Sequence, residues 1–122
     1  DTDFFGVMED DLMPAAHPSD LSARIAQSLA DLPPTADMLY LEYCFETCSR
    51  MENHTRSIAR SYRPACTASM VFTRRGVRRA LAHIRRPFLA LDNMYAELAG
   101  HGELEAYSAT PPCFFQDMFF GR

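Results

Sequence analysis

The chain has no lysine, because all 12 of its basic residues are arginine. This absence excludes Schiff-base chemistry on lysine and the P-loop lysine of many nucleotide-binding proteins. No apolar run approaches the roughly 20 residues that a membrane-spanning helix needs. The acidic N-terminus carries no signal-peptide pattern, and a strand pattern starts at once, at Phe4. We therefore expect residues 1–122 to form a single domain that is truncated at its N-terminus, as in an excerpt of a longer protein.

The composition is that of an ordinary globular domain, with 48% hydrophobic and 23% charged residues. A net charge of -4 gives no general reason to expect nucleic acid or an anionic membrane as a partner. The exception is a basic cluster made of Arg74, Arg75, Arg78, Arg79, Arg85 and Arg86. At helical spacing these arginines lie opposite Val77, Ala80, Leu81 and Ile84, so we predict a solvated helix face. Near the start of that helix, Arg74 or Arg75 is placed to reach a diphosphate.

Four cysteines, at positions 44, 48, 66 and 113, form an even set. In an oxidising compartment they allow two disulfides in three possible pairings. The spacing Cys44-x3-Cys48 differs from the usual zinc-knuckle spacing, and no second close pair completes a four-ligand site. We expect disulfides or buried free thiols rather than zinc, and no metal-stabilised nucleic-acid module built from the cysteines and arginines.

Hydrophobic periodicity predicts an α/β chain. Strand patterns cover 4–8, 38–41, 68–72 and 104–108. Helices are predicted from Ser19 to Leu32, from Thr73 to about residue 84, and from Asp92 to about residue 99, with the first residue of each as its cap. The first strand, helix and strand read as a βαβ unit with parallel pairing. Residues 42–66 read as a long, partly irregular excursion that the cysteines pin in place.

The first strand ends in the acidic triplet Glu9-Asp10-Asp11. Three adjacent carboxylates are costly to hold together unless a positive charge neutralises them. Mn2+ or Mg2+ would do so through oxygen ligands. In an extended backbone Glu9 and Asp11 point the same way and Asp10 points the opposite way, so Glu9 and Asp11 are the predicted metal ligands. The alternative is a solvated acidic turn.

The segment GVMEDDL (6–12) resembles the strand-then-EDD motif of glycosyltransferase family 25, which includes collagen galactosyltransferases and bacterial lipopolysaccharide glycosyltransferases. Three further segments resemble motifs of that family in the same order: CTASMVFTRRGVRRAL (66–81), PFLALDNMY (87–95) and PPCFFQD (111–117). Methionine replaces leucine before EDD, Met70 replaces a tyrosine, and Thr73 stands where serine is common. The N-terminal half of the family's catalytic domain has no counterpart here.

The resemblance implies the C-terminal part of a catalytic domain, with a partial GT-A-like (Rossmann-like) mixed sheet and flanking helices. It implies that Glu9, Asp10 and Gln116 bind the sugar donor, with Asp11 and Glu9 on the metal. Asp92 matches an aspartate on the acceptor side and would act as general base. The alternatives are that Asp92 is a helix cap and that Gln116 satisfies buried loop backbone. His101 is a further candidate ligand, or a surface residue.

The expected function is metal-dependent, inverting transfer of a sugar from a nucleotide-sugar, by resemblance a UDP-sugar, to a hydroxyl of a protein or glycan acceptor. The alternative is an inactive family member or fragment that acts as a binding or assembly module. Convergence of Glu9, Asp11 and Asp92 on one pocket favours the enzyme, and scattered carboxylates favour the module. The cysteines favour the lumen of the endoplasmic reticulum or Golgi, whereas bacterial relatives act in the cytoplasm.

Overall fold

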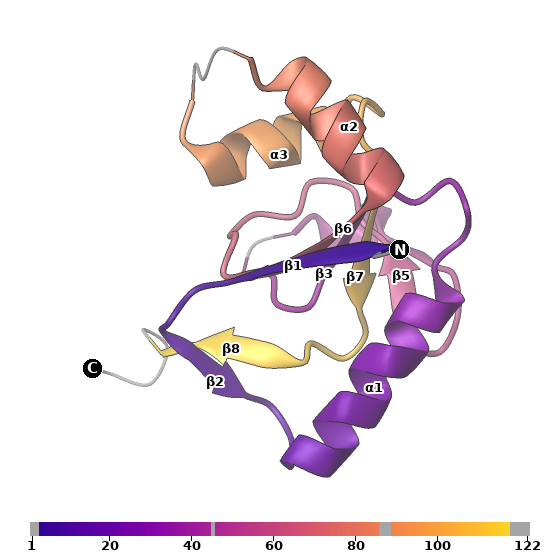
Figure 1. The fold of residues 1–122 in the computed structure, drawn as a ribbon, viewed down its shortest axis with the longest axis vertical. Helices are drawn as coiled ribbons and strands as arrows, with labels where there is room; N and C mark the ends of the chain where they lie inside the picture. The colour runs from indigo at the N-terminus through magenta and orange to yellow at the C-terminus, as the bar shows by residue number, and fades with distance from the viewer. Residues whose placement is uncertain (1–2, 45, 86–88, 118–122) are drawn as a thin grey trace.

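The structure is a computed structural model that describes residues 3–44, 46–85 and 89–117. Within these ranges the chain is a mixed α/β fold with a six-stranded mixed sheet, a two-stranded sheet and three α-helices (Figure 1). The predicted mixed sheet with flanking helices is therefore confirmed. None of the described helices combines the length and apolar character that crossing a membrane requires.

The large sheet has the strand order β1-β6-β3-β7-β5-β4. Its members are β1 (Phe4–Met8), β6 (Ser69–Thr73), β3 (Met38–Tyr40), β7 (Ala106–Ala109), β5 (Ile58–Arg60) and β4 (Glu52–Asn53). Strands β3 and β7 pair in parallel, and the other neighbours pair antiparallel. The three residues of β3 are fully buried, as the continuous apolar run at 38–41 predicts.

The predicted βαβ unit is wrong in its pairing. Helix α1 (Pro18–Asp31) does connect β1 to β3, but β6 lies between these two strands and is antiparallel to both. Strand β6 takes the inner position because Met70, Val71 and Phe72 are buried. β1 is an edge strand of this sheet, and all five of its residues are exposed. β1 and β3 nevertheless run in the same direction, which brings their carboxyl ends to one edge.

The helices cover opposite faces of the sheet (Figure 1). Helix α1 packs Leu21, Ile25 and Leu29 against a cluster that contains Leu39, as its predicted apolar face requires. Helices α2 (Arg74–His83) and α3 (Leu91–Gly100) lie on the other face. There Met38, Tyr40, Met70, Phe72, Ala80, Ala99, Leu104 and Ala106 form a second cluster. Alternate residues of β3 thus serve different layers.

Only one of the three predicted helix caps is confirmed. Thr73 caps α2, because its Oγ1 accepts the backbone N–H of Gly76 at 2.9 Å. Helix α1 instead begins at Pro18 with His17 as N-cap, since proline fits the first helical position. Helix α3 has Ala90 as N-cap, which places Asp92 inside the first turn.

The arginine-rich face of α2 is only partly a solvated face. Arg75 Nε lies 3.1 Å and Arg79 Nη1 lies 2.7 Å from the carboxylate of Asp37, whose side chain is fully buried. The backbone N–H of Glu105 donates to the same carboxylate at 2.8 Å. The inward placement of Leu81 is wrong, because this side chain is 67% exposed.

The 42–66 excursion is more ordered than the sequence indicates. It holds a 3-10 helix (η1, Cys48–Arg50) and the β4–β5 hairpin, whose Ile58 and Ala59 are buried. A disulfide joins Cys44 to Cys66, with their Cα atoms 5.8 Å apart. The predicted covalent pin is therefore present, while Cys48 and Cys113 are free thiols, exposed and buried respectively.

A small second sheet joins the two ends of the chain. Strand β2 (Leu12–Pro14) pairs antiparallel with β8 (Phe114–Gln116), with Leu12 opposite Gln116. The sequence predicts no strand pairing for the apolar segment at 113–115. The sheet carries the C-terminal segment to the end of β1, beside the acidic triplet.

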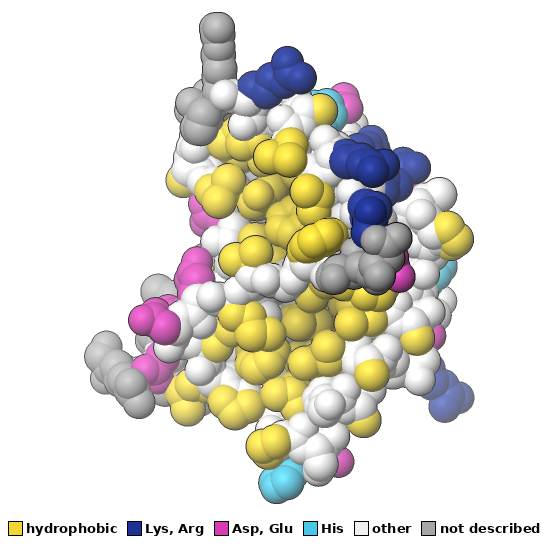
Figure 2. Space-filling model, viewed as in Figure 1, with side chains coloured by type: hydrophobic (Ala, Val, Ile, Leu, Met, Phe, Trp, Pro, Cys, Tyr) yellow, Lys and Arg dark blue, Asp and Glu magenta, His cyan; other side chains and the backbone are white. Residues whose placement is uncertain are grey.

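Hydrophobic side chains also gather on one face of the molecule (Figure 2). On β1, the side chains of Phe4, Phe5, Val7 and Met8 are 38–56% exposed. Among the described residues, the outer edge of β1 has no neighbouring strand. This combination is unusual, because protected edge strands are short, charged or interrupted by proline.

Substituting Gly76→Ala tests the contact between α2 and the start of β3. A Cβ at this position would lie 1.8 Å from the carbonyl oxygen of Asp37, which is rigid backbone. Replacing glycine by alanine normally stabilises a helix. Here we expect Gly76→Ala to lower the unfolding free energy by about 2 kcal/mol, because the clash with Asp37 outweighs that gain. Urea unfolding measures it. Gly6→Ala, whose Cβ meets nothing within 4 Å, is the matched control; equal stability of both variants would contradict the contact.

Candidate functional site

The carboxyl ends of β1 and β3 form one edge with the amino end of β6 between them. The backbone N–H of Glu9 donates to the carbonyl of Ala68 at 2.8 Å. The backbone N–H of Leu41 donates to the carbonyl of Ser69 at 3.0 Å. Glu9 and Glu42, which follow the last paired residues of the two strands, are therefore held on either side of β6.

Glu42 is the central side chain of this edge, and the sequence did not single it out. It is 2% exposed, and its Oε2 atom is buried with no hydrogen-bond partner in the part of the chain that the structure describes. Burial, reinforced by the carboxylates of Glu9 and Asp11, raises the pKa of Glu42 to about 7. A signal was present, since Glu42 follows the apolar run 38–41 directly. Its acidic neighbours are distant in sequence, so only the fold reveals the cluster.

The small sheet positions Asp11 and Gln116. The backbone N–H of Asp117 donates to the carbonyl of Asp11 at 2.7 Å, one step beyond the Leu12–Gln116 pair. Asp11 Oδ1 is buried and has no hydrogen-bond partner within the described ranges. Gln116 is 9% exposed and pairs with Leu12, the residue that follows the acidic triplet. Asp10 is exposed.

The edge offers oxygen donors of the kind that a hard divalent cation takes, but the carboxylates of Glu9, Asp11 and Glu42 do not all lie within 4.8 Å of one another in this structure. Among the described residues, Asp11 Oδ1, Glu42 Oε2 and Ser69 Oγ are buried oxygen atoms with no hydrogen-bond partner, as is the Tyr40 hydroxyl in the α2–α3 layer. Such atoms are costly in a folded protein unless a ligand satisfies them. Glu9 adds an exposed carboxylate, which Thr67 Oγ1 contacts at 3.2 Å. We call Glu9, Asp11 and Glu42 the carboxylate cluster.

Asp92 lies elsewhere, in the first turn of α3. One of its carboxylate oxygens accepts the backbone N–H of Asn93 at 2.9 Å. Burial raises the pKa of the Tyr40 hydroxyl, and Tyr95, Glu46 and Asp92 raise it further. Asp92 itself is half-buried. Among the described residues, Glu9, Asp11 and Asp92 do not bring their carboxylates within 4.8 Å of one another. The predicted convergence of these three residues is not present.

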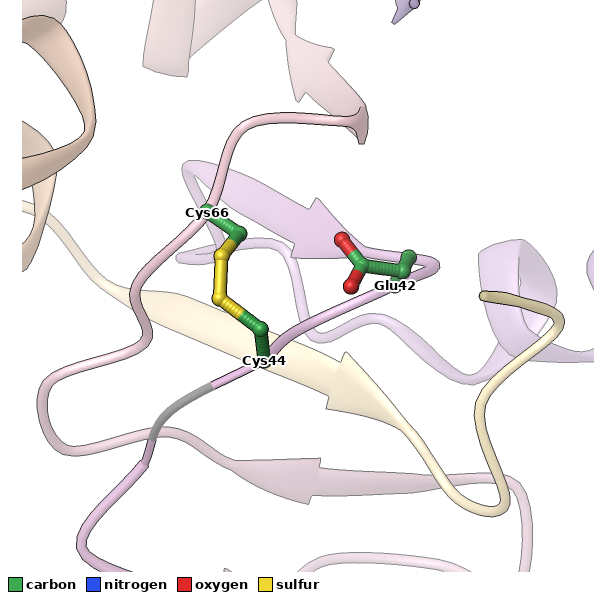
Figure 3. Close-up of side chains that lie close together, drawn as sticks. All are labelled: Glu42, Cys44 and Cys66. Atoms are coloured by element: carbon green, nitrogen blue, oxygen red, sulfur yellow. A yellow bond between two sulfur atoms is a disulfide. The ribbon is translucent and has the colours of Figure 1, made fainter. Parts of the chain in front are cut away.

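The one group of metal-binding side chains that does meet within 4.8 Å in the described chain is Glu42, Cys44 and Cys66 (Figure 3). The two cysteines form the disulfide in this structure. The close-up shows the Glu42 carboxylate beside that disulfide, on the far side from the chain that leads to η1. Glu42 therefore belongs to the carboxylate cluster and also lies beside the sulfur atoms.

Other candidate residues serve local roles. His101 Nε2 lies 3.2 Å from Glu97 on α3, so the structure gives no support to its role as a metal ligand. A hollow of about 550 Å3 opens beside η1 and is lined in part by Arg50, Tyr62 and Gly100. It holds none of the predicted site residues, and the Arg50 guanidinium is already stacked 4.0 Å over the Tyr62 ring.

No protein-family model matches this chain, and its comparison with curated proteins and with solved structures gives no match either.

Replacing Glu42 with glutamine tests its burial as a carboxyl group. The pKa of about 7 for Glu42 in the folded protein exceeds the ordinary glutamate value of 4.5. The folded state thus holds a proton that the unfolded chain releases, and the unfolding free energy falls as pH rises from 4.5 through 7. Without divalent cations, we expect a loss of about 2 kcal/mol over this window once solvent screening is allowed for.

Glu42→Gln should flatten that decline, as measured by urea unfolding at a series of pH values. Glu52→Gln, at an exposed position of β4, is the matched control and should keep the wild-type profile. A decline of equal size in wild type and Glu42→Gln would show that other groups cause it.

Proposed function

We propose that this chain is the metal- and acceptor-facing part of an inverting glycosyltransferase that uses a nucleotide-sugar donor. The observation that supports this most is the carboxylate cluster, with its unpartnered Asp11 and Glu42 oxygens at the carboxyl ends of two strands. Ligands of open α/β sheets bind at such ends. The order of four motifs similar to glycosyltransferase family 25 gives the transfer chemistry, and a UDP-sugar as the donor class.

In this proposal Glu9, Asp11 and Glu42 hold Mn2+ or Mg2+. The bound cation would neutralise the negative charge that develops on the departing diphosphate. Asp10, exposed at the same turn, faces the donor. Gln116, held opposite Leu12 by the small sheet, would orient the donor through its amide.

Asp92 would act as general base for the acceptor hydroxyl. In an inverting, in-line displacement, the base and the leaving group lie on opposite sides of the anomeric carbon. The base is therefore expected outside the metal's ligand set, but Glu9, Asp11 and Asp92 do not meet within 4.8 Å, an outcome that favours the inactive module described next. Protein or glycan hydroxyls are the proposed acceptors.

A second candidate is a catalytically inactive module that binds ligands or partners with the same edge. It is favoured by the position of Asp92, whose carboxylate caps a backbone N–H of its own helix. Both candidates retain the carboxylate cluster, so metal binding does not distinguish them. Turnover of the donor does.

An Asp11→Asn variant tests the proposal directly. Hydrolysis of UDP-sugars by the protein should require Mn2+ or Mg2+, and Asp11→Asn should lower kcat/KM by at least 100-fold, since removing a single charge-stabilising donor costs about that much. Manganese binding, followed by electron paramagnetic resonance, should weaken in parallel. Asp20→Asn, on the exposed first turn of α1, is the matched control.

Unchanged hydrolysis by Asp11→Asn would refute the metal assignment. Manganese binding without any turnover of UDP-sugars, in a protein whose Asp11→Asn variant loses that binding, would favour the inactive module.

A further inference from the structure

Cys44, Cys66 and Glu42 bring together the donor atoms of a second kind of metal site. Their ligand atoms lie within 4.8 Å of one another, and Glu42 contributes a buried oxygen with no hydrogen-bond partner. Two thiolates and one carboxylate form a softer set than the carboxylate cluster, and thiolates select zinc over manganese or magnesium. Cys44 and Cys66 are half-buried, and a water molecule would be the fourth ligand of a tetrahedral zinc ion.

We propose that, once the Cys44–Cys66 disulfide is reduced, Glu42, Cys44 and Cys66 bind one Zn2+ ion. A dithiol supplies the two electrons and two protons: the Cys44–Cys66 bond breaks, each sulfur becomes a thiol, and the dithiol becomes a disulfide. Zinc then displaces one proton from each thiol, because the thiolate is the ligand. The redox state of Cys44 and Cys66 therefore determines whether Glu42 is a ligand in the carboxylate cluster or in the zinc site.

The two cysteines stay together without their bond because Glu46 links the same two segments. Its carboxylate accepts the backbone N–H of Tyr62 at 3.1 Å and that of Arg63 at 2.7 Å. Pro64, two residues before Cys66, is fully buried and holds the second segment in the core. Reduction thus removes one of several connections between the segments, not the only one.

The backbone allows the sulfur atoms to adjust. Tetrahedral zinc places its sulfur ligands about 3.7 Å apart, so the two sulfurs must separate after reduction. Cys66 has φ = 68°, a left-handed conformation that few residues other than glycine adopt. A residue held there is under strain, and release of the disulfide lets both side chains rotate toward a shared ion.

The test uses Zn2+ itself, without any nucleotide-sugar, so its outcome is separate from that of the proposed transfer activity. The protein is reduced with a dithiol, freed of reductant under anaerobic conditions, and titrated with Zn2+ against a chromophoric chelator. Reduced protein should bind one zinc per chain, and oxidised protein should bind none at this site. Replacing zinc by Co2+ should give thiolate-to-cobalt absorption in the near ultraviolet.

Three variants assign the ligands. Cys66→Ser and Glu42→Gln should each weaken zinc binding by more than about tenfold, the scale seen for loss of an outer-shell partner alone. Cys48→Ser is the matched control and should bind zinc as the wild type does, since Cys48 is exposed and outside the group. Glu42→Gln retains both cysteines, so it folds with the Cys44–Cys66 disulfide formed and is reduced only afterwards. Its result therefore does not depend on whether the protein can fold without that bond.

Failure of reduced wild-type protein to compete with the chelator would overturn the proposal. So would unchanged zinc affinity in Glu42→Gln, or loss of zinc in Cys48→Ser with retention in Cys66→Ser.

Discussion

The buried carboxylate of Asp37 is the interaction on which the arrangement of the sheet and its upper helices depends. It lies just before β3, fully buried, and is neutralised by Arg75 and Arg79 of α2 and by the backbone N–H of Glu105. A buried charge of this kind is tolerated only when its partners stay in place. The Asp37 carboxylate therefore fixes α2 over the start of β3. It also connects both elements to Glu105, which lies just before β7. As a result, the middle of the sheet and the helix α2 are held together.

The two ends of β3 differ in how their charges are compensated. Asp37, at the amino end, receives two guanidinium groups. Glu42, after the carboxyl end, is equally buried but has the carboxylates of Glu9 and Asp11 as its charged neighbours, and they raise its pKa further. This difference between a neutralised buried acid and one with an unsatisfied oxygen is what the proposal of a ligand at Glu42 rests on.

What the sequence could predict was set by how local each interaction is. The strands at 4–8 and 38–41 and the Thr73 cap depend on neighbours within a few residues, and they are confirmed. The insertion of β6 between β1 and β3 depends on which strand buries more apolar surface, a competition that no local pattern records. For the same reason Glu42 went unnoticed: its acidic neighbours lie more than 30 positions away in the chain. Leu81 was misplaced because the apolar stripe of α2 is wider than the surface that covers it.

The exposure of β1 has a consequence for dynamics. A strand paired on one side and uncovered on both faces has few contacts to lose, so its opening costs less free energy than that of the buried strands beside it. Glu9 and Asp11 follow directly from its end, and the order of the carboxylate cluster is tied to the order of this strand. By linkage, any ligand that binds the cluster in its closed arrangement also stabilises β1 against local opening. Binding at the acidic end and order along the exposed edge are thus two measures of one equilibrium.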